Sequence, residues 1–147
     1  MITAKGPCHL QTFLLRGDSR LLVCTPSNSS ADLITSRLIA SGKVLYGDLV
    51  RLNAFQRSGA SVPEVIQPYC FLPEEEGGQL DSVARHRVVV TTCSTAGTLY
   101  RLGLRAGHFT HVFIDEAGHM TEPEVLVPLC LLHSSVGQLV LAGDPSS

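Results

Sequence analysis

The sequence lacks the features that define several broad classes of protein. No apolar run in its 147 residues is long enough to cross a membrane, and its first residues do not have a signal-peptide pattern. The 11 basic and 13 acidic residues leave no excess of positive charge, so a contact with nucleic acid would depend on a few local groups. We therefore expect no membrane partner and no large basic binding surface.

The cysteines also lack the arrangement of a disulfide framework. There are five of them, they are widely scattered, and no CxxC pair occurs. Cys24 and Cys93 lie inside apolar runs, where a buried reduced thiol is expected. The cysteine pattern therefore indicates a reducing compartment, cytoplasmic or nuclear.

Four short apolar segments predict the strands of a parallel sheet. Each is continuously apolar rather than alternating, as in strands that are covered on both faces, and each ends in Thr, Ser, Asp or Gly. The segments are 20–27, 86–94, 110–117 and 137–144. Helices are expected between them, at 31–42 after a cap at Ser29 or Ser30, at 96–104 after Thr95, and at 122–132. This alternation predicts an α/β fold with ligands beyond the carboxyl ends of the strands.

The segment 56–82 differs from the rest in composition. It contains three prolines, a run of three glutamates and a pair of glycines. We interpret it as a surface loop insertion in a chain, residues 1–147, that forms one domain or a part of one.

Two adjacent carboxylates, Asp115 and Glu116, follow the third predicted strand directly. An aspartate at the end of such a strand can hold Mg²⁺, usually through water, while the metal bridges nucleotide phosphates. A second acid one residue later points elsewhere and can orient or deprotonate an attacking water. The alternative is that the pair only caps the next helix.

Three further motifs follow the other strand ends: PSNSSADL at 26–33, TTCSTAG at 91–97 and GDP at 143–145. In this order, with DEAG, the set resembles the first motor domain of superfamily 1B helicases. It is most similar to the Armitage or Moloney-leukaemia-virus-ten type of RNA helicase, with strings PSNSAADL, TT-x-x-TAG, HFTHxFIDEAGH-x-x-EPE and GQLVLAGDP. The resemblance covers about residues 20–145, and HFTHVFIDEAGHMTEPE at 108–124 is its most specific part.

The resemblance implies a role for each motif. Asp115 would anchor magnesium and Glu116 would activate water. Gly143 and Asp144 would bind the nucleotide and couple the state of its γ-phosphate to the grip on nucleic acid. Hydroxyls, amides and helix N-terminal N–H groups bind phosphate oxygens without reading bases. The residues implied to contact single-stranded RNA in this way are Pro26, Ser27, Asn28, Thr91, Thr92 and Thr95.

The resemblance also implies a three-layer RecA-like P-loop NTPase fold with a parallel sheet. ATP and Mg²⁺ would be the cofactors of an ATP-dependent RNA helicase, and single-stranded RNA its substrate. A member of this family is expected in the cytoplasm, in RNA granules (P-bodies), with silencing or decay factors as partners in RNA-mediated gene silencing or RNA decay.

The sequence departs from the family in lacking the P-loop GxxxxGK[ST], whose N–H groups and lysine hold the phosphates. Gly42-Lys43 lacks the first glycine and the Ser or Thr, so we reject it. The family order would place the P-loop before Met1 and make residues 1–16 the rest of its helix, although Gly6-Pro7 would break that helix. The glutamine that follows GDP and the second motor domain are also absent.

We therefore interpret the chain as an incomplete motor domain 1, an internal fragment that is inactive by itself. The alternative is a catalytically dead, helicase-derived module that binds RNA or protein. A zinc site is a further alternative, because His108-x-x-His111 and Cys130-x-x-His133 have ligand-like spacing. Core packing is favoured over zinc for these residues, since they adjoin or lie in apolar runs.

Overall fold

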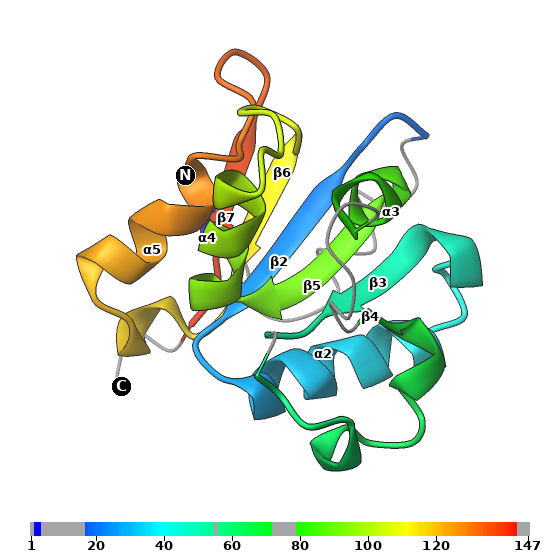
Figure 1. The fold of residues 1–147 in the computed structure, drawn as a ribbon. Helices are drawn as coiled ribbons and strands as arrows, with labels where there is room; N and C mark the ends of the chain where they lie inside the picture. The colour runs from blue at the N-terminus through cyan, green and yellow to red at the C-terminus, as the bar shows by residue number, and fades with distance from the viewer. Residues whose placement is uncertain (1, 4–16, 55, 72–78, 144–147) are drawn as a thin grey trace.

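A parallel β-sheet forms the middle layer of the molecule, and helices pack on both of its faces (Figure 1). The computed structural model describes residues 2–3, 17–54, 56–71 and 79–143. In this part of the chain the sheet has seven strands in the order β1-β7-β6-β2-β5-β3-β4, and every neighbouring pair is parallel. The strands are β1 (Ile2–Thr3), β2 (Leu21–Thr25), β3 (Leu49–Leu52), β4 (Cys70–Phe71), β5 (Val88–Thr92), β6 (His111–Ile114) and β7 (Gln138–Leu141).

The continuous apolar pattern of the central strands arises because both faces of the sheet are covered. In β2, Leu21 and Val23 belong to the apolar cluster beneath α2, whereas Leu22 and Cys24 belong to the cluster beneath α4. All four side chains are at most 1% exposed. The predicted α/β fold with a parallel sheet is confirmed, and β2, β5, β6 and β7 all lie within predicted strand segments.

The helices begin at polar residues that accept hydrogen bonds from free backbone N–H groups. Ser27 caps α2, Thr92 caps α4, and Thr121 forms a capping box with Glu124 at the start of α5. The expected caps at Ser29 or Ser30 and at Thr95 were therefore wrong by two or three residues, because the strands end earlier than the apolar pattern suggests. The helices are α2 (Asn28–Ala40), α3 (Gln79–Arg85), α4 (Cys93–Arg101) and α5 (Glu122–Leu129), and Pro128 lies in the last turn of α5.

Two segments differ from the structure that the sequence predicted for them. Within 56–82, where we expected a surface loop, β4 pairs with β3 and Ile66 is completely buried. Short 3₁₀ turns at 59–61 and 67–69 occur there as well, and 72–78 lies outside the described residues. Near the start of the chain, residues 2–3 form a strand beside β7 where we expected a helix, and 4–16 lies outside the described residues.

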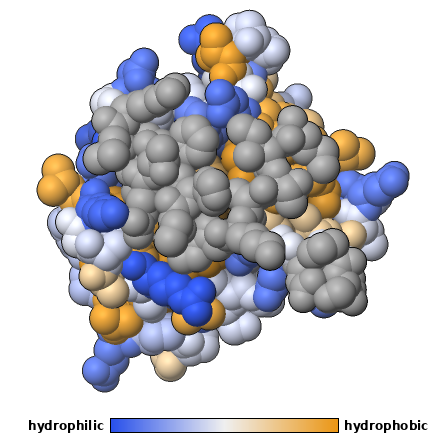
Figure 2. Space-filling view, turned by 180° about the vertical axis from the view of Figure 1, so that it is seen from behind, coloured by the Kyte–Doolittle hydropathy of each residue, from blue (hydrophilic) through white to orange (hydrophobic). Residues whose placement is uncertain are grey.

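The described surface retains apolar side chains outside the two core clusters. Seen from behind, hydrophobic patches lie between hydrophilic side chains on the described part of that face (Figure 2). The most exposed large apolar residues of the described chain are Leu45, at 72%, Tyr46, at 64%, and Val136, at 63%. Single exposed apolar residues are common on protein surfaces, so they do not define a binding site by themselves.

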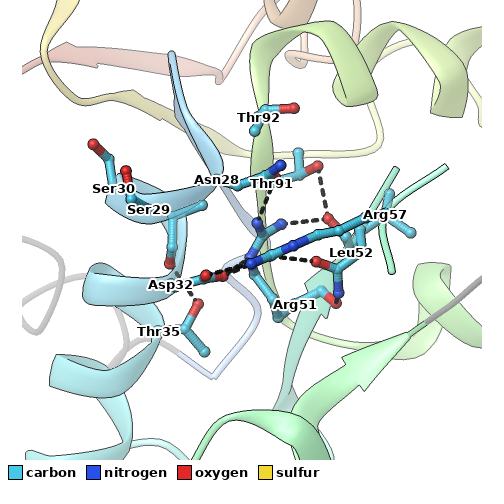
Figure 3. A network of polar contacts seen from close by, with 12 residues as sticks. Asn28, Ser29, Ser30, Asp32, Thr35, Arg51, Leu52, Arg57, Thr91 and Thr92 are labelled. Atoms are coloured by element: carbon cyan, nitrogen blue, oxygen red, sulfur yellow. Dashed lines mark hydrogen bonds and ion pairs between the residues drawn. The ribbon is translucent and has the colours of Figure 1, made fainter. Parts of the chain in front are cut away.

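The carboxylate of Asp32 joins α2 to β3 and to the loop after it (Figure 3). Its Oδ1 accepts hydrogen bonds from Arg51 Nε at 3.1 Å and Arg57 Nη1 at 2.9 Å, and its Oδ2 accepts one from Arg57 Nη2 at 2.7 Å. The Arg51 side chain is completely buried and also donates to Asn28 Oδ1 and to the Leu52 carbonyl oxygen. A buried guanidinium needs such partners, so this network fixes the N-terminal half of α2 against the sheet.

The charges in this network determine how its groups titrate. Burial by itself would raise the pKa of the Asp32 carboxyl, but the hydrogen bond from Arg57 and the positive charges of Arg51 and Arg57 outweigh burial and lower that pKa. Burial lowers the pKa of Arg51, and the charge of Asp32 opposes that effect. The hydrogen bond to Asp32 raises the pKa of Arg57. The ionised form of all three groups is therefore the one that the folded chain contains near neutral pH.

We predict that Asp32→Asn lowers the free energy of unfolding by about 3–5 kcal/mol, because Arg51 stays buried without its charged partner. Urea denaturation of the wild type and the variant measures the difference. Asp81→Asn is the matched control, since Asp81 is an exposed carboxylate in a helix, and it should change the free energy by less than about 0.5 kcal/mol. Equal effects of the two substitutions would contradict the role of the network.

We also predict that the stability of the folded chain decreases at acidic pH. Because the folded-state pKa of Asp32 is lowered, its stabilisation is fully present above the unfolded-state pKa and is lost as the pH falls through the folded-state pKa. The free energy of unfolding should therefore decrease below about pH 4, where a carboxyl of ordinary pKa begins to protonate. Urea midpoints measured across this range should fall more steeply for the wild type than for Asp32→Asn. Parallel curves would rule out Asp32 as a source of the acid sensitivity.

Candidate functional site

The four sequence motifs meet at one edge of the sheet. Because β2, β5, β6 and β7 are parallel neighbours or near neighbours, the residues that follow them leave the sheet on the same side. Thr25 pairs with Thr92, and Cys24 pairs with Ile114, so the PSN, TT and DEAG motifs begin at nearly the same height. Gly143 follows β7 at the same edge, and Asp144 lies outside the described residues.

Asp115 continues β6 by one residue. Its backbone N–H donates to the Cys24 carbonyl oxygen at 2.9 Å. Burial raises the pKa of its carboxyl, a hydrogen bond from the Glu116 backbone opposes the rise, and the negative charge of Glu116 adds to it. Among the described side chains, none forms a hydrogen bond or salt bridge with this carboxylate. A half-buried carboxylate without a side-chain partner in the described structure is a suitable ligand for Mg²⁺, which binds through one or two carboxylates and keeps several waters.

Glu116 turns the chain away from the strand. Its backbone is in the left-handed conformation, with φ 54° and ψ 37°, and it is the single described residue other than glycine with positive φ. Such a conformation is strained for a residue with a side chain and often occurs at functional sites. The two adjacent carboxylates also differ in their partners, since Glu116 accepts a hydrogen bond from the Ser30 hydroxyl and Asp115 has no described side-chain partner.

The backbone around this turn is held by β7 and by α2. The Ala117 N–H donates to the Ala142 carbonyl oxygen at 3.0 Å. A Cβ at Gly143 would lie 3.5 Å from the Ala117 nitrogen, an ordinary van der Waals contact, so the end of β7 lies beside the turn. From the other side, the Ser30 hydroxyl donates to Glu116 Oε2 at 3.0 Å. The turn that carries Glu116 is thus in direct contact with both flanking motifs.

The PSN motif presents polar groups at the exposed start of α2. Pro26 and Asn28 are exposed, and Ser27 is half-buried. Because Asn28 Oδ1 accepts a hydrogen bond from Arg51 at 3.1 Å, its amide hydrogens remain as donors toward solvent. The sequence reasoning missed Arg51 and Arg57, which both donate hydrogen bonds to Asp32 of this motif. The one signal was a lone arginine inside the apolar run LVRLNA.

The TT motif is much less accessible than the PSN motif. Thr91 is completely buried, and its hydroxyl donates to the Leu52 carbonyl oxygen at 3.0 Å. Thr92 and Thr95 are below one-tenth exposed and bond to each other at the start of α4, with 3.0 Å between their hydroxyl oxygens. Ser94, between them, is exposed and was not singled out from the sequence. At this strand end a ligand could reach the Ser94 hydroxyl more readily than the threonine hydroxyls.

The residues of the zinc alternative do not assemble. No group of three or more His, Cys, Asp or Glu side chains suited to a metal ion occurs in the described part of the chain. His108 lies beside a cation, with 3.2 Å between its Nε2 and Arg20 Nη1. His111 is buried, whereas Cys130 is exposed rather than packed in the core as expected. In the same described part, no helix is both long and apolar enough to span a membrane.

Comparison with known proteins identifies relatives of this chain. The family model for the AAA domain matches residues 73–146. The human RNA helicase Mov10l1 is 47% identical over 136 residues, which are 92% of this chain and 11% of that protein. The Drosophila melanogaster protein named "Probable RNA helicase armi" is 42% identical over 146 residues, covering 86% of this chain and 12% of its own length. The chain therefore spans about an eighth or less of these relatives.

Solved structures show the same fold at low sequence identity. The UvsW helicase from bacteriophage T4 has a TM-score of 0.59 at 12% identity, over 93% of this chain and 41% of that one. The C-terminal part of the Fun30 ATPase domain has a TM-score of 0.57 at 10% identity, over 92% and 38%. These likenesses confirm the RecA-like arrangement of strands and helices. The chain belongs to the AAA domain family, and most of its length is similar to a segment of RNA helicases of the Armitage and Mov10l1 type.

Proposed function

We propose that this chain supplies one wall of an ATP site and part of a single-stranded RNA groove in an ATP-dependent RNA helicase. The observation that carries the proposal is the pair of adjacent acids, Asp115 and Glu116, at a strained turn that contacts both flanking motifs. A helix cap alone would not need a left-handed residue with its carboxylate directed at another helix. The printed names of the relatives, RNA helicase Mov10l1 and armi, support RNA as the nucleic acid.

In this proposal the two acids act separately. Asp115 would hold Mg²⁺ through water, and the bound metal would neutralise charge on the nucleotide phosphates. Glu116 would orient the attacking water and accept its proton. Gly143 lies against the turn that bears Glu116, so a movement of the GDP motif would shift the backbone of Glu116. The resemblance assigns Asp144, which lies outside the described residues, to the same coupling.

The RNA contacts would come mainly from the PSN motif. Asn28 would donate its amide hydrogens to a phosphate, since Arg51 occupies its carbonyl oxygen. Pro26 and Ser27 flank it at the start of α2, where the free backbone N–H groups favour an anion. The TT motif would make the second contact with RNA through backbone groups and the exposed Ser94. The buried side chains of Thr91, Thr92 and Thr95 would support this surface from the protein interior. A role in RNA silencing or decay and a place in cytoplasmic RNA granules extend the proposal from the resemblance.

The second candidate is a catalytically dead module that binds RNA or protein. It would require only the exposed start of α2, with Pro26 and Asn28, and no catalytic acid. The two functions differ in one respect that can be measured. Only the helicase function requires Glu116 for turnover in a full-length protein that carries this segment.

We predict that the 147-residue chain binds a single-stranded oligouridylate without base preference, and that Asn28→Ala weakens binding roughly 5- to 10-fold through loss of the phosphate hydrogen bonds. Fluorescence anisotropy measures the Kd. Gln138→Ala is the matched control, since Gln138 is an exposed amide at the opposite end of the sheet, and it should leave the Kd unchanged. An equal loss for both variants, or none for Asn28→Ala, would remove Asn28 from the RNA site.

The acids are tested in a full-length helicase that carries this segment. We predict that Asp115→Asn weakens Mg²⁺–nucleotide binding, because the metal loses its anionic ligand. Glu116→Gln should change the nucleotide Kd by less than about tenfold while lowering kcat roughly 10²- to 10⁴-fold, since it removes only the general base. Steady-state ATPase rates, nucleotide affinities and melting temperatures distinguish the outcomes. If both variants lose stability alike and keep kcat per folded molecule, the pair is only a helix cap.

A further inference from the structure

Three side chains form a hydrogen-bonded chain from the PSN motif to the DEAG motif. The Ser27 hydroxyl donates to Ser30 Oγ at 3.0 Å, and the Ser30 hydroxyl donates to Glu116 Oε2 at 3.0 Å. Ser27 caps α2, Ser30 lies in its first turn, and Glu116 is 86 residues further along the chain. Ser30 is thus the single side chain through which the start of α2 touches the carboxylate of Glu116 in the described structure.

The direction of these hydrogen bonds is fixed by chemistry. An ionised carboxylate can only accept, so the hydroxyl hydrogen of Ser30 must point to Glu116. The oxygen of Ser30 is then the acceptor for Ser27, whose single hydroxyl hydrogen is used there. Ser27 Oγ accepts the Ser30 backbone N–H at 3.3 Å, and Ser29, 3.2 Å away, is left to donate to it. As long as Glu116 is ionised and bonded to Ser30, Ser27 has no hydroxyl hydrogen to give to a phosphate.

Ser30, the third serine of PSNSSADL, can be replaced by alanine to test this path. Alanine is a favourable residue in a helix, and the Ser30 side chain is half-buried. Ser30→Ala therefore removes the hydroxyl with little expected effect on folding.

We propose that Ser30 is a positioning residue that holds Glu116 against α2 and releases it when RNA binds at Ser27. The proposal rests on the proposed function, in which a phosphate contacts the start of α2. A phosphate oxygen that accepts the hydrogen of Ser27 breaks the bond from Ser27 to Ser30. Hydrogen bonds in a chain strengthen one another, so the bond from Ser30 to Glu116 then weakens. The carboxylate of Glu116 becomes free to turn toward its water, and RNA binding is thereby coupled to the general base.

Coupling between two sites is reciprocal, so it can be measured from the RNA side without ATP. If Ser30 carries the coupling, a change at Glu116 must alter RNA affinity through Ser30. Glutamine can donate as well as accept, so Glu116→Gln no longer fixes the direction of the Ser30 hydroxyl. It also removes a negative charge near the RNA, an effect that does not depend on Ser30 and is therefore the same in both backgrounds.

The test is a double-mutant cycle on the 147-residue chain, with the Kd for a single-stranded oligouridylate measured by fluorescence anisotropy at constant salt. Glu116→Gln should tighten binding roughly 5- to 10-fold when Ser30 is present and less than about 2-fold in the Ser30→Ala background. Ser29→Ala is the matched control, because Ser29 contacts Ser27 but not Glu116, and it should leave the effect of Glu116→Gln at its wild-type size. Ser30→Thr, which keeps the hydroxyl, should retain the coupling.

The outcomes separate this inference from the proposed function. If the wild-type chain binds no RNA, the proposed function fails and the role of Ser30 fails with it. If the chain binds RNA but Glu116→Gln has the same effect with and without Ser30, or none in either case, Ser30 does not couple the two motifs. Melting temperatures of all variants verify that each is folded. If Ser30→Ala does not fold, the deciding comparison is the effect of Glu116→Gln on the Kd in the Ser30→Thr and Ser29→Ala backgrounds. Unequal effects in these two backgrounds would overturn the inference.

Discussion

The burial of the Arg51 charge is the constraint on which the arrangement of the site depends. A guanidinium with no exposed surface must be neutralised and fully hydrogen-bonded, and Asp32 of α2 provides the charge. Arg57, in the loop after β3, also donates hydrogen bonds to Asp32. The Asp32 carboxylate therefore connects α2, β3 and this loop. Because Asp32 lies one turn into α2, the same interaction fixes the start of that helix. This ion pair therefore helps to position Asn28 and Ser30, which lie in the same first turn.

A parallel sheet gives this chain a short path between two kinds of ligand. The strand ends bring the acids of one motif and the polar helix start of another to the same edge, although they are far apart in sequence. Residues placed this way need only one intervening side chain to be in contact, as Ser30 is between Ser27 and Glu116. In the proposed function, communication between the nucleotide site and the RNA site would therefore need no movement of a whole domain at this step.

Much of the fold could be predicted from the sequence, because continuous apolar runs and polar strand ends are local signals. The four central strands and the shared edge follow from them. The strand β3 was missed since Arg51 interrupts its apolar pattern, and the partner that makes this arginine acceptable lies on another element. The burial of Thr91 could not be predicted either, because its hydroxyl is satisfied by the Leu52 carbonyl oxygen, a contact between strands. The left-handed backbone of Glu116 depends on the flanking β7 and α2 and has no local sequence signal.

The backbone of Glu116 has a consequence for how this site can change. Glycine would relieve the left-handed conformation, and asparagine tolerates it better than glutamate does. Either exchange would favour folding and would remove the carboxylate. At this position stability and chemistry therefore select for different residues, and a stabilised sequence chosen without regard to activity would be expected to discard the acid.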